Sequence, residues 1–107
     1  SDVYSTKIAI NTIIKDIDSI KLNYVDKGQG VYSGLYILCD IDFDVISSIL
    51  RSNEFVDYVR SLKKYKSGGY YTFSSKDLEQ YLNYKLTDIY GTLAIGQRIP
   101  QCDYTLF

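Results

Sequence analysis

The stretch that decides the fold is Val31-Tyr32-Ser33-Gly34-Leu35-Tyr36-Ile37-Leu38-Cys39-Asp40-Ile41, an almost continuous apolar run in a chain of 107 residues. A strand with one face in water alternates apolar and polar residues, whereas an unbroken apolar strand is covered on both faces or nearly so. The glycines of residues 26–30 predict a turn just before this run. Residues 31–41 are therefore the predicted centre of a β-sheet.

Residues 7–25 precede this strand and fit two patterns. Their isoleucines can form a helical stripe, but Ile8 with Ile10, and Ile20 with Leu22 and Tyr24, also alternate as strand residues do. Isoleucine and threonine are stiff at χ1 and pack well on a pleated surface, so their abundance favours strands.

Helices are predicted after the central strand. Asp42 or Asp44 can cap a helix whose apolar residues are Val45, Ile46, Ile49 and Leu50. A second cap at Ser52-Asn53 and a further apolar stripe of Phe55, Val56, Val59 and Leu62 indicate either two short helices or one bent helix that ends near Leu62.

A polar loop at residues 63–69 leads into a short aromatic strand at residues 70–73. Ser74 or Ser75 then caps a third helix, in which Ser74 and Asp77 approximate a capping box and Leu78, Tyr81, Leu82 and Leu86 form the apolar face. Residues 87–107 can add an edge strand or two. The sequence thus predicts the α+β class: one domain with a small mixed sheet and about three helices packed on it.

Composition narrows the classes of function. The net charge of −1 excludes a uniformly basic DNA binder, and the absence of histidine excludes histidine-based catalysis and the usual zinc finger. Cys39 lies in the apolar run, which favours a buried thiol over a disulfide with Cys102 and hence a reducing, cytoplasmic compartment. No stretch is long and apolar enough to span a membrane, and no leader opens the chain. Because methionine is absent even at position 1, we expect a piece of a larger protein.

Charge is unevenly distributed along the chain. Residues 1–50 hold four lysines against seven aspartates, whereas residues 60–76 hold five cations and no acidic residue. The same segment carries Tyr65, Gly68-Gly69, Tyr70 and Tyr71. Cations suit phosphates, glycines allow close backbone approach, and tyrosines stack on bases or donate to phosphate. The segment fits a nucleic-acid-contacting loop, although such a run is more often a solvated turn beside core aromatics.

Two runs carry a resemblance to a known family. They are Ile46-Ser47-Ser48-Ile49-Leu50-Arg51-Ser52-Asn53-Glu54-Phe55-Val56-Asp57-Tyr58-Val59 and Lys66-Ser67-Gly68-Gly69-Tyr70-Tyr71-Thr72-Phe73-Ser74, followed by the helix from Lys76. Together they resemble the C-terminal specificity region of TaqI-like, type II adenine-specific DNA methyltransferases, in which a helix of the form LLxxLNSxxFxxY precedes a GGYYxFSxxxLExxP segment. The resemblance covers roughly residues 34–86. It departs from the family at residues 80–86, where the family's proline is missing.

The resemblance implies that residues 1–107 form a DNA target-recognition domain of a restriction-modification enzyme. Its partners would be double-stranded DNA and an N-terminal catalytic domain that binds S-adenosylmethionine and methylates the flipped adenine. We expect no cofactor, membrane contact or catalysis in this chain. Its only proline, Pro100, rules out a catalytic Asn-Pro-Pro-Tyr motif, and no glycine-rich cofactor fingerprint opens a helix.

The predicted DNA-contacting residues are Arg60, Lys63, Lys64, Tyr65, Lys66, Ser67, Gly68, Gly69, Tyr70, Tyr71 and Lys76. Lysines would bind phosphates, and one of Tyr70 and Tyr71 would face DNA while the other faces the core. Each has an alternative structural role: Gly68-Gly69 can serve a turn with positive φ, and Arg60 can pair with Asp57 or Glu54. Asp42 and Asp44 are interpreted as helix caps rather than metal ligands. The competing hypothesis is a protein-protein interaction module with a tyrosine-rich face.

Overall fold

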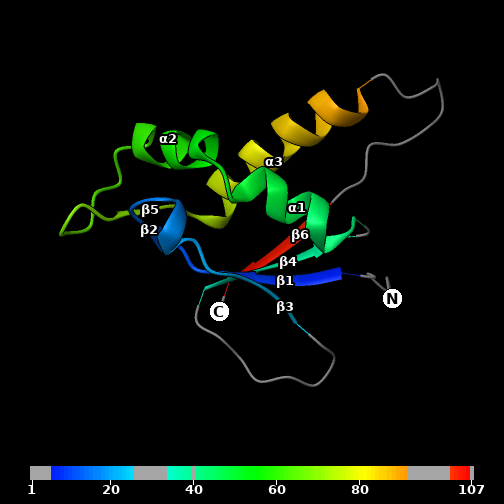
Figure 1. Ribbon diagram of the computed structural model, residues 1–107, viewed down its shortest axis with the longest axis horizontal. Helices are drawn as coiled ribbons and strands as arrows, with labels where there is room; N and C mark the ends of the chain where they lie inside the picture. Colours follow the sequence, from blue (N-terminus) through cyan, green and yellow to red (C-terminus); the bar gives the residue numbers. More distant parts are fainter. Residues whose placement is uncertain (1–5, 26–33, 40, 92–101, 107) are drawn as a thin grey trace.

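The computed structural model describes residues 6–25, 34–39, 41–91 and 102–106. Within these residues the elements follow one another in this order (Figure 1): β1 (Thr6–Ile10), β2 (Ile13–Ile14), a 3-10 turn η1 (Ile17–Ser19), β3 (Leu22–Tyr24), β4 (Leu35–Cys39), α1 (Phe43–Leu50), α2 (Asn53–Ser61), β5 (Tyr71–Thr72), α3 (Ser75–Tyr90) and β6 (Cys102–Leu106).

Four strands form the main sheet in the order β3-β1-β4-β6, and β4 lies inside it as predicted. Four of the five β4 residues are buried, which agrees with the continuous apolar run. Every strand pairing that the structure describes is antiparallel, so the sheet is antiparallel where the sequence suggested a mixed one. The predicted strand also included residues 31–33 and Asp40, which lie outside the described residues.

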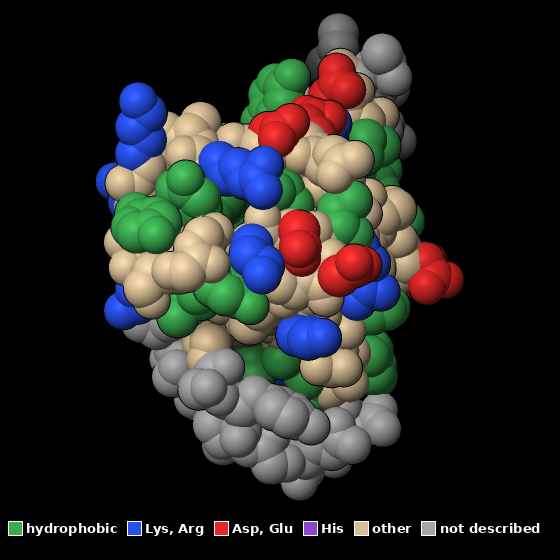
Figure 2. Space-filling model, turned by 60° about the vertical axis from the view of Figure 1, so that its left-hand side comes forward, with side chains coloured by type: hydrophobic (Ala, Val, Ile, Leu, Met, Phe, Trp, Pro, Cys, Tyr) green, Lys and Arg blue, Asp and Glu red, His purple; other side chains and the backbone are tan. Residues whose placement is uncertain are grey.

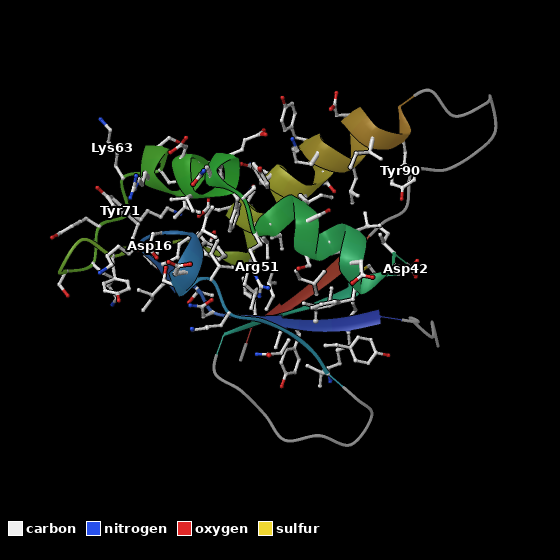
Figure 3. All side chains as sticks on the ribbon, in the orientation of Figure 1. Asp16, Asp42, Arg51, Lys63, Tyr71 and Tyr90 are labelled. Atoms are coloured by element: carbon white, nitrogen blue, oxygen red, sulfur yellow. The ribbon has the colours of Figure 1, made fainter. Side chains whose placement is uncertain are left out.

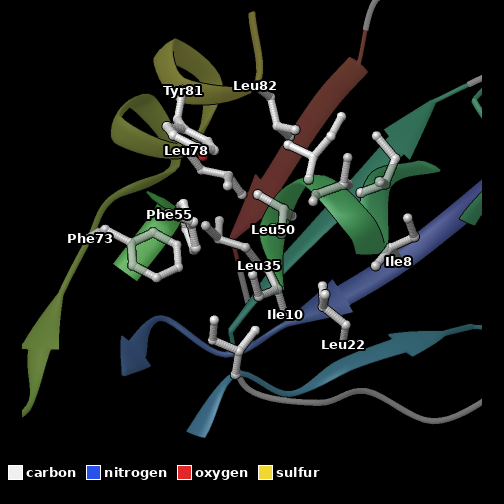
Figure 4. Close-up of a cluster of buried hydrophobic side chains, with 14 of the residues drawn as sticks. Ile8, Ile10, Leu22, Leu35, Leu50, Phe55, Phe73, Leu78, Tyr81 and Leu82 are labelled. Carbon is white, nitrogen blue, oxygen red and sulfur yellow. The ribbon is translucent and has the colours of Figure 1, made fainter. Parts of the chain in front are cut away.

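The three helices lie on one face of this sheet (Figure 1), which confirms the predicted α+β class. Alternate strand residues, among them Ile8, Ile10 and Leu35, point into the layer between sheet and helices (Figure 4) and are fully or almost fully buried. Ile37 is fully buried in the same cluster. A buried aliphatic side chain of this size contributes about 1.5–3 kcal/mol. The opposite face holds a second, small cluster of Ala9, Val25 and Tyr36.

The helical stretch after the sheet consists of two separate helices. Arg51 ends α1, and the hydroxyl of Ser52 then accepts a hydrogen bond of 3.2 Å from the backbone N–H of Phe55, which caps α2. Asp42 occupies the N-cap position of α1, although its side chain makes no capping hydrogen bond. Asp44 lies within the first turn, where its negative charge interacts favourably with the positive end of the helix dipole and stabilises the helix.

The capping box predicted for α3 is confirmed. Ser74 and Asp77 satisfy each other's backbone N–H groups, with distances of 3.2 Å and 2.9 Å. The apolar face holds the predicted Leu78, Tyr81, Leu82 and Leu86. The helix continues to Tyr90, beyond the residue 87 at which the sequence suggested a tail, because no glycine or proline interrupts it before Gly91. None of the described helices combines the length and apolar character that a bilayer span requires.

Residues 7–25 form strands rather than a helix, as the sequence favoured. A turn capped by Asp16 separates β2 from β3. Asn11 holds this region together, because its side chain donates to the carbonyls of Ile13 (3.1 Å) and Ser19 (2.9 Å) and accepts from the N–H of Lys21 (2.9 Å). β2 lies outside the main sheet and pairs with β5, next to the basic segment.

Candidate functional site

The centre of the basic segment is a compact hairpin of residues 64–72, which we call the hairpin. Its two arms are joined by backbone hydrogen bonds of 2.9 Å from Thr72 N–H to the Lys64 carbonyl and from Lys66 N–H to the Tyr70 carbonyl. Tyr65 and Tyr71 form the bridge between them. The sequence predicted a polar loop here, whereas the structure has an ordered two-armed ribbon.

Gly68 and Gly69 form the tip of the hairpin. The N–H of Tyr70 donates to the carbonyl of Ser67 at 3.0 Å, and the two glycines between them have φ values of +60° and +86°. Positive φ at both central residues is typical of a type I′ turn, which suits the twist of a hairpin and favours glycine. The structural role proposed for this glycine pair is therefore present in the fold.

A third segment completes the site. Strand β2 pairs with β5 in the register Ile13 to Thr72 and Ile14 to Tyr71. Phe73 N–H extends this pairing with a bond of 3.1 Å to the carbonyl of Thr12. Residues 12–15, distant in sequence from the basic segment, thus lie alongside it, and Figure 3 shows Asp16, Tyr71 and Lys63 at the same end of the molecule.

The two neighbouring tyrosines at the start of β5 have different surroundings. Tyr71 packs against the hydrophobic core and meets the Tyr65 ring edge to face at 5.6 Å. Tyr70 is 36% exposed, and the ammonium of Lys15 lies 5.1 Å from the centroid of its ring. Alternation along a strand explains the difference. Tyr70 is the tyrosine of this pair that faces outward.

The cations of the segment divide into two groups. Lys63, Lys66 and Lys76 are exposed, and within the described residues no carboxylate binds them. Lys64 instead forms an ion pair of 2.5 Å with Asp77, which connects the hairpin to the start of α3. The first group can therefore bind an anionic partner directly, whereas Lys64 would first have to break its ion pair with Asp77.

Asp77 is a junction between the hairpin, α2 and α3. Burial acts to raise its pKa, but hydrogen bonds from Lys64 and Ser74 outweigh burial, so the pKa lies below its ordinary value of 3.8. Its backbone carbonyl accepts a bond of 2.8 Å from the Tyr58 hydroxyl. Burial, and then the charge of Asp77, raise the pKa of Tyr58. These bonds fix the hairpin against the helices.

Arg60 does not pair with Asp57 or Glu54, the partners that the sequence offered. Its guanidinium donates to the backbone carbonyl of Lys15 at 2.9 Å, and Glu54 instead pairs with Lys85 at 2.9 Å. Arg60 thus holds the β2 segment against the end of α2.

A shallow hollow of about 460 Å³ lies between the 3-10 turn and the hairpin. Tyr70 and Ile13 supply apolar surface to it, and two lysines and two aspartates supply balanced charge; its lining comprises Asn11, Ile13, Lys15, Asp16, Asp18, Ser19, Lys21 and Tyr70. Figure 2 looks onto this end of the molecule and shows lysine and arginine side chains along the left margin and also across the centre, where they are interspersed with acidic side chains.

The structure adds Lys15 to the predicted site residues. Charge counting along the chain placed this lysine in the acidic half, so it gave no sign of Lys15. The alternation of Ile13 and Lys15 about buried Ile14 is the only sequence signal for an outward lysine here. Across the described parts of the chain, no three histidine, cysteine, aspartate or glutamate side chains are grouped so as to hold a metal ion.

Comparison with known proteins returned no match, whether with family models, curated proteins or solved structures.

Proposed function

We propose that this chain binds double-stranded DNA through the outer side of the hairpin. The observation that carries the proposal is that exposed Lys63 and Lys66 lie beside and on an ordered ribbon, where the ammonium of exposed Lys15 lies 5.1 Å from the centroid of the outward Tyr70 ring. Lysines bind phosphates as point charges, and a two-stranded ribbon has the dimensions that the major groove admits. A near-neutral chain with a local basic surface binds DNA at that surface rather than over its whole exterior.

The specific role that we propose is target recognition for an adenine-specific DNA methyltransferase of a restriction-modification system. Support comes from the sequence resemblance over residues 34–86, whose quoted runs span α1, α2, the hairpin and the start of α3. The catalytic domain with S-adenosylmethionine would belong to another part of the parent enzyme, which acts on DNA in the cytoplasm. The present chain would bind the DNA duplex and select its sequence, without catalysing methyl transfer.

Fluorescence-anisotropy titration of a short duplex across a salt series tests the binding surface. The informative variant replaces Lys15, Lys63 and Lys66 with alanine and leaves Lys64 in its ion pair with Asp77. Each lost phosphate contact should reduce the log-log salt slope by about 0.9, so the slope should become about 3 units shallower. The matched control replaces Lys7, Arg51 and Lys85, which removes equal charge elsewhere, and circular dichroism verifies that both variants fold.

Equal loss of affinity in the two triple variants would contradict the proposed surface. The methyltransferase role has a separate test, in which the chain selects duplexes from a random pool. Enrichment of a short motif that contains adenine supports target recognition, because one mismatched base pair costs about 1–3 kcal/mol in specific complexes. Binding without any enriched motif would leave a nonspecific DNA binder and refute that role.

A protein-binding function is the alternative, and one observation favours it. Ile13, Tyr65 and Tyr70 are 40%, 60% and 36% exposed on or beside the hairpin, and tyrosine is enriched at protein interfaces. A partner protein held by this apolar surface would bind with little dependence on salt. Salt-insensitive binding lost on Tyr65→Ser and Tyr70→Ser substitution would favour this function over DNA binding.

A further inference from the structure

The hollow beside the hairpin combines an aromatic ring, an aliphatic side chain and charged groups. Tyr70 and Ile13 are both exposed and both line this hollow, whose volume is about 460 Å³. Pockets that hold small organic ligands have volumes of about 300–1,000 Å³ and combine apolar surface with a few polar groups. The hollow therefore has the size and the kind of lining that a small ring system requires.

Two polar side chains of the lining hold the backbone of the turn in place. Asn11 donates to two backbone carbonyls of this turn and accepts from one backbone N–H. The hydroxyl of Ser19 accepts from the N–H groups of Lys15 (2.8 Å) and Asp16 (3.0 Å) and donates to the Asp16 carbonyl (2.7 Å). A site whose backbone is already fixed loses less conformational freedom when a ligand binds. The hollow is thus pre-organised on the side of the turn.

The charged side chains of the hollow are exposed and carry both signs. They are Lys15, Lys21, Asp16 and Asp18. Ammonium groups donate hydrogen bonds and ionised carboxylates accept them. Because two lysines balance two aspartates, this lining suits a neutral ring with donors and acceptors on its edge better than a compact anion. A nucleobase is such a ring.

The ring of Tyr70 decides which nucleobases can enter. The ammonium of Lys15 lies 5.1 Å from the centroid of this ring, and a Cβ at Gly69 would lie 3.5 Å from Cδ of the same lysine. The lysine stem therefore runs along the tip of the hairpin, where its ammonium can bind a phosphate next to the ring. Aromatic side chains stack on bases of any sequence. In a paired duplex both faces of a base are covered by its neighbours, so only an unpaired base can present a face to Tyr70.

We propose that this hollow is a binding site for an unpaired nucleobase. The base stacks on Tyr70 and contacts Ile13, its edge forms hydrogen bonds with the charged groups of the turn, and Lys15 binds the adjoining phosphate. Two sources can supply such a base: a DNA strand with an unpaired position, and a free nucleotide. For a DNA strand the inference rests on the proposed DNA binding, to which it adds a preference for a locally unpaired duplex.

The first arm of the test compares two fluorescent duplexes of the same sequence, one fully paired and one with a single additional adenine in one strand. Fluorescence anisotropy should show about tenfold tighter binding of the bulged duplex, because stacking of one base on an aromatic side chain contributes about this factor. Tyr70→Ala should bring the ratio of the two dissociation constants close to one, whereas Tyr70→Phe, which keeps the ring, should retain the preference.

Tyr84→Ala is the matched control for this arm. Tyr84 is exposed and has the ammonium of Lys85 5.9 Å from its ring centroid, but it lies on α3 and does not line the hollow. Its replacement should leave the ratio unchanged. A preference for the bulged duplex that survives Tyr70→Ala would overturn the inference, since the bend of the bulged DNA and not the hollow would then be recognised.

The second arm titrates the isotope-labelled chain with deoxyadenosine monophosphate and follows its N–H signals by NMR. Saturable shifts at Ile13, Lys15 and Tyr70 would show that a free nucleotide fills the hollow. A preference for the bulged duplex without such shifts would assign the site to a DNA strand. Equal affinity for the two duplexes, with no shifts, would overturn the inference and leave the proposed DNA binding intact. If neither duplex binds, the proposed DNA binding fails, and the nucleotide titration alone decides on the hollow.

Discussion

The guanidinium of Arg60 donates a hydrogen bond of 2.9 Å to the backbone carbonyl oxygen of Lys15. This bond joins the end of α2 to residues that follow β2, which are far away in the sequence. It belongs to a small set of contacts that hold the β2 segment, the hairpin and the start of α3 together. The surface proposed to bind DNA is therefore assembled from three separate parts of the chain.

Arg60→Ala should loosen the β2 segment. A hydrogen bond to a charged group contributes about 1.5–3 kcal/mol when shielded, and since Arg60 is exposed we expect a loss of about 1 kcal/mol in the free energy of unfolding. Urea denaturation measures it. Arg51→Ala, which removes another exposed arginine, is the control. An equal loss in both variants would show that the hydrogen bond to the Lys15 carbonyl adds nothing measurable to the free energy of unfolding.

Two glycine substitutions should differ in cost. A Cβ at Gly34, which has φ +131°, would lie 2.5 Å from the backbone oxygen of Ile10, so Gly34→Ala should lower the free energy of unfolding by about 3 kcal/mol. A Cβ at Gly68 would meet only the Tyr70 ring at 3.9 Å, and Gly68→Ala should cost about 1 kcal/mol for its positive φ. Thermal denaturation of both variants provides the comparison. The reverse order of stability would contradict the described turn and strand geometry.

Asp77 should make stability depend on pH in the acid range. Because its folded pKa lies below 3.8, its contribution is complete above that value and is lost as pH falls through the folded pKa. Asp77→Asn should cost about 1 kcal/mol at neutral pH, and the difference from the unsubstituted chain should disappear in acid. Denaturation midpoints from neutral to strongly acid pH measure this effect. Asp57→Asn, on the exposed side of α2, is the control, and the same pH-dependent difference in both variants would contradict this role of Asp77.

Removal of the hydroxyl from half-buried Tyr58 and from buried Tyr81 should affect stability differently. Tyr58 donates to the carbonyl of Asp77, so Tyr58→Phe should lower the free energy of unfolding by about 1 kcal/mol. The buried Tyr81 hydroxyl makes no hydrogen bond of standard geometry among the described residues and only a weaker interaction with the Ser52 hydroxyl, so Tyr81→Phe should leave stability unchanged or raise it. Urea denaturation of the pair is the measurement. A loss on Tyr81→Phe as large as that on Tyr58→Phe would indicate a partner for this hydroxyl.

Local sequence signals predicted most of the elements. The apolar run around Ile37 correctly indicated an interior strand, and the capping signals at Ser52 and Ser74 marked helix starts that the structure confirms. Such signals succeed because apolar periodicity and capping act over a few neighbouring residues. The end of α3 was predicted too early because only the absence of a breaker before Gly91 marks it.

Long-range pairings could not be predicted in the same way. Nothing near Ile13 indicates that β2 leaves its neighbours to pair with Thr72, so the charge pattern alone assigned Lys15 to the acidic half of the chain. The hairpin was likewise expected as a polar loop, since glycine pairs mark a turn without specifying which strands it joins. The charge pattern of the sequence located the basic segment, but the pairing of β2 with β5 determines which other side chains lie on the same surface.

The position of β6 also has a consequence for synthesis on the ribosome. β4 lies between β1, which is synthesised before it, and β6, whose Leu106 pairs with Leu35 of β4. Translation proceeds at roughly 5–20 residues per second, so the nascent chain exposes one edge of β4 for several seconds. During that interval α1, α2 and α3 can form by local contacts. The pairing of β6 with β4 joins residues far apart in the sequence, and pairings of this kind slow folding. β4 would therefore be the segment at which a nascent-chain chaperone has most to protect.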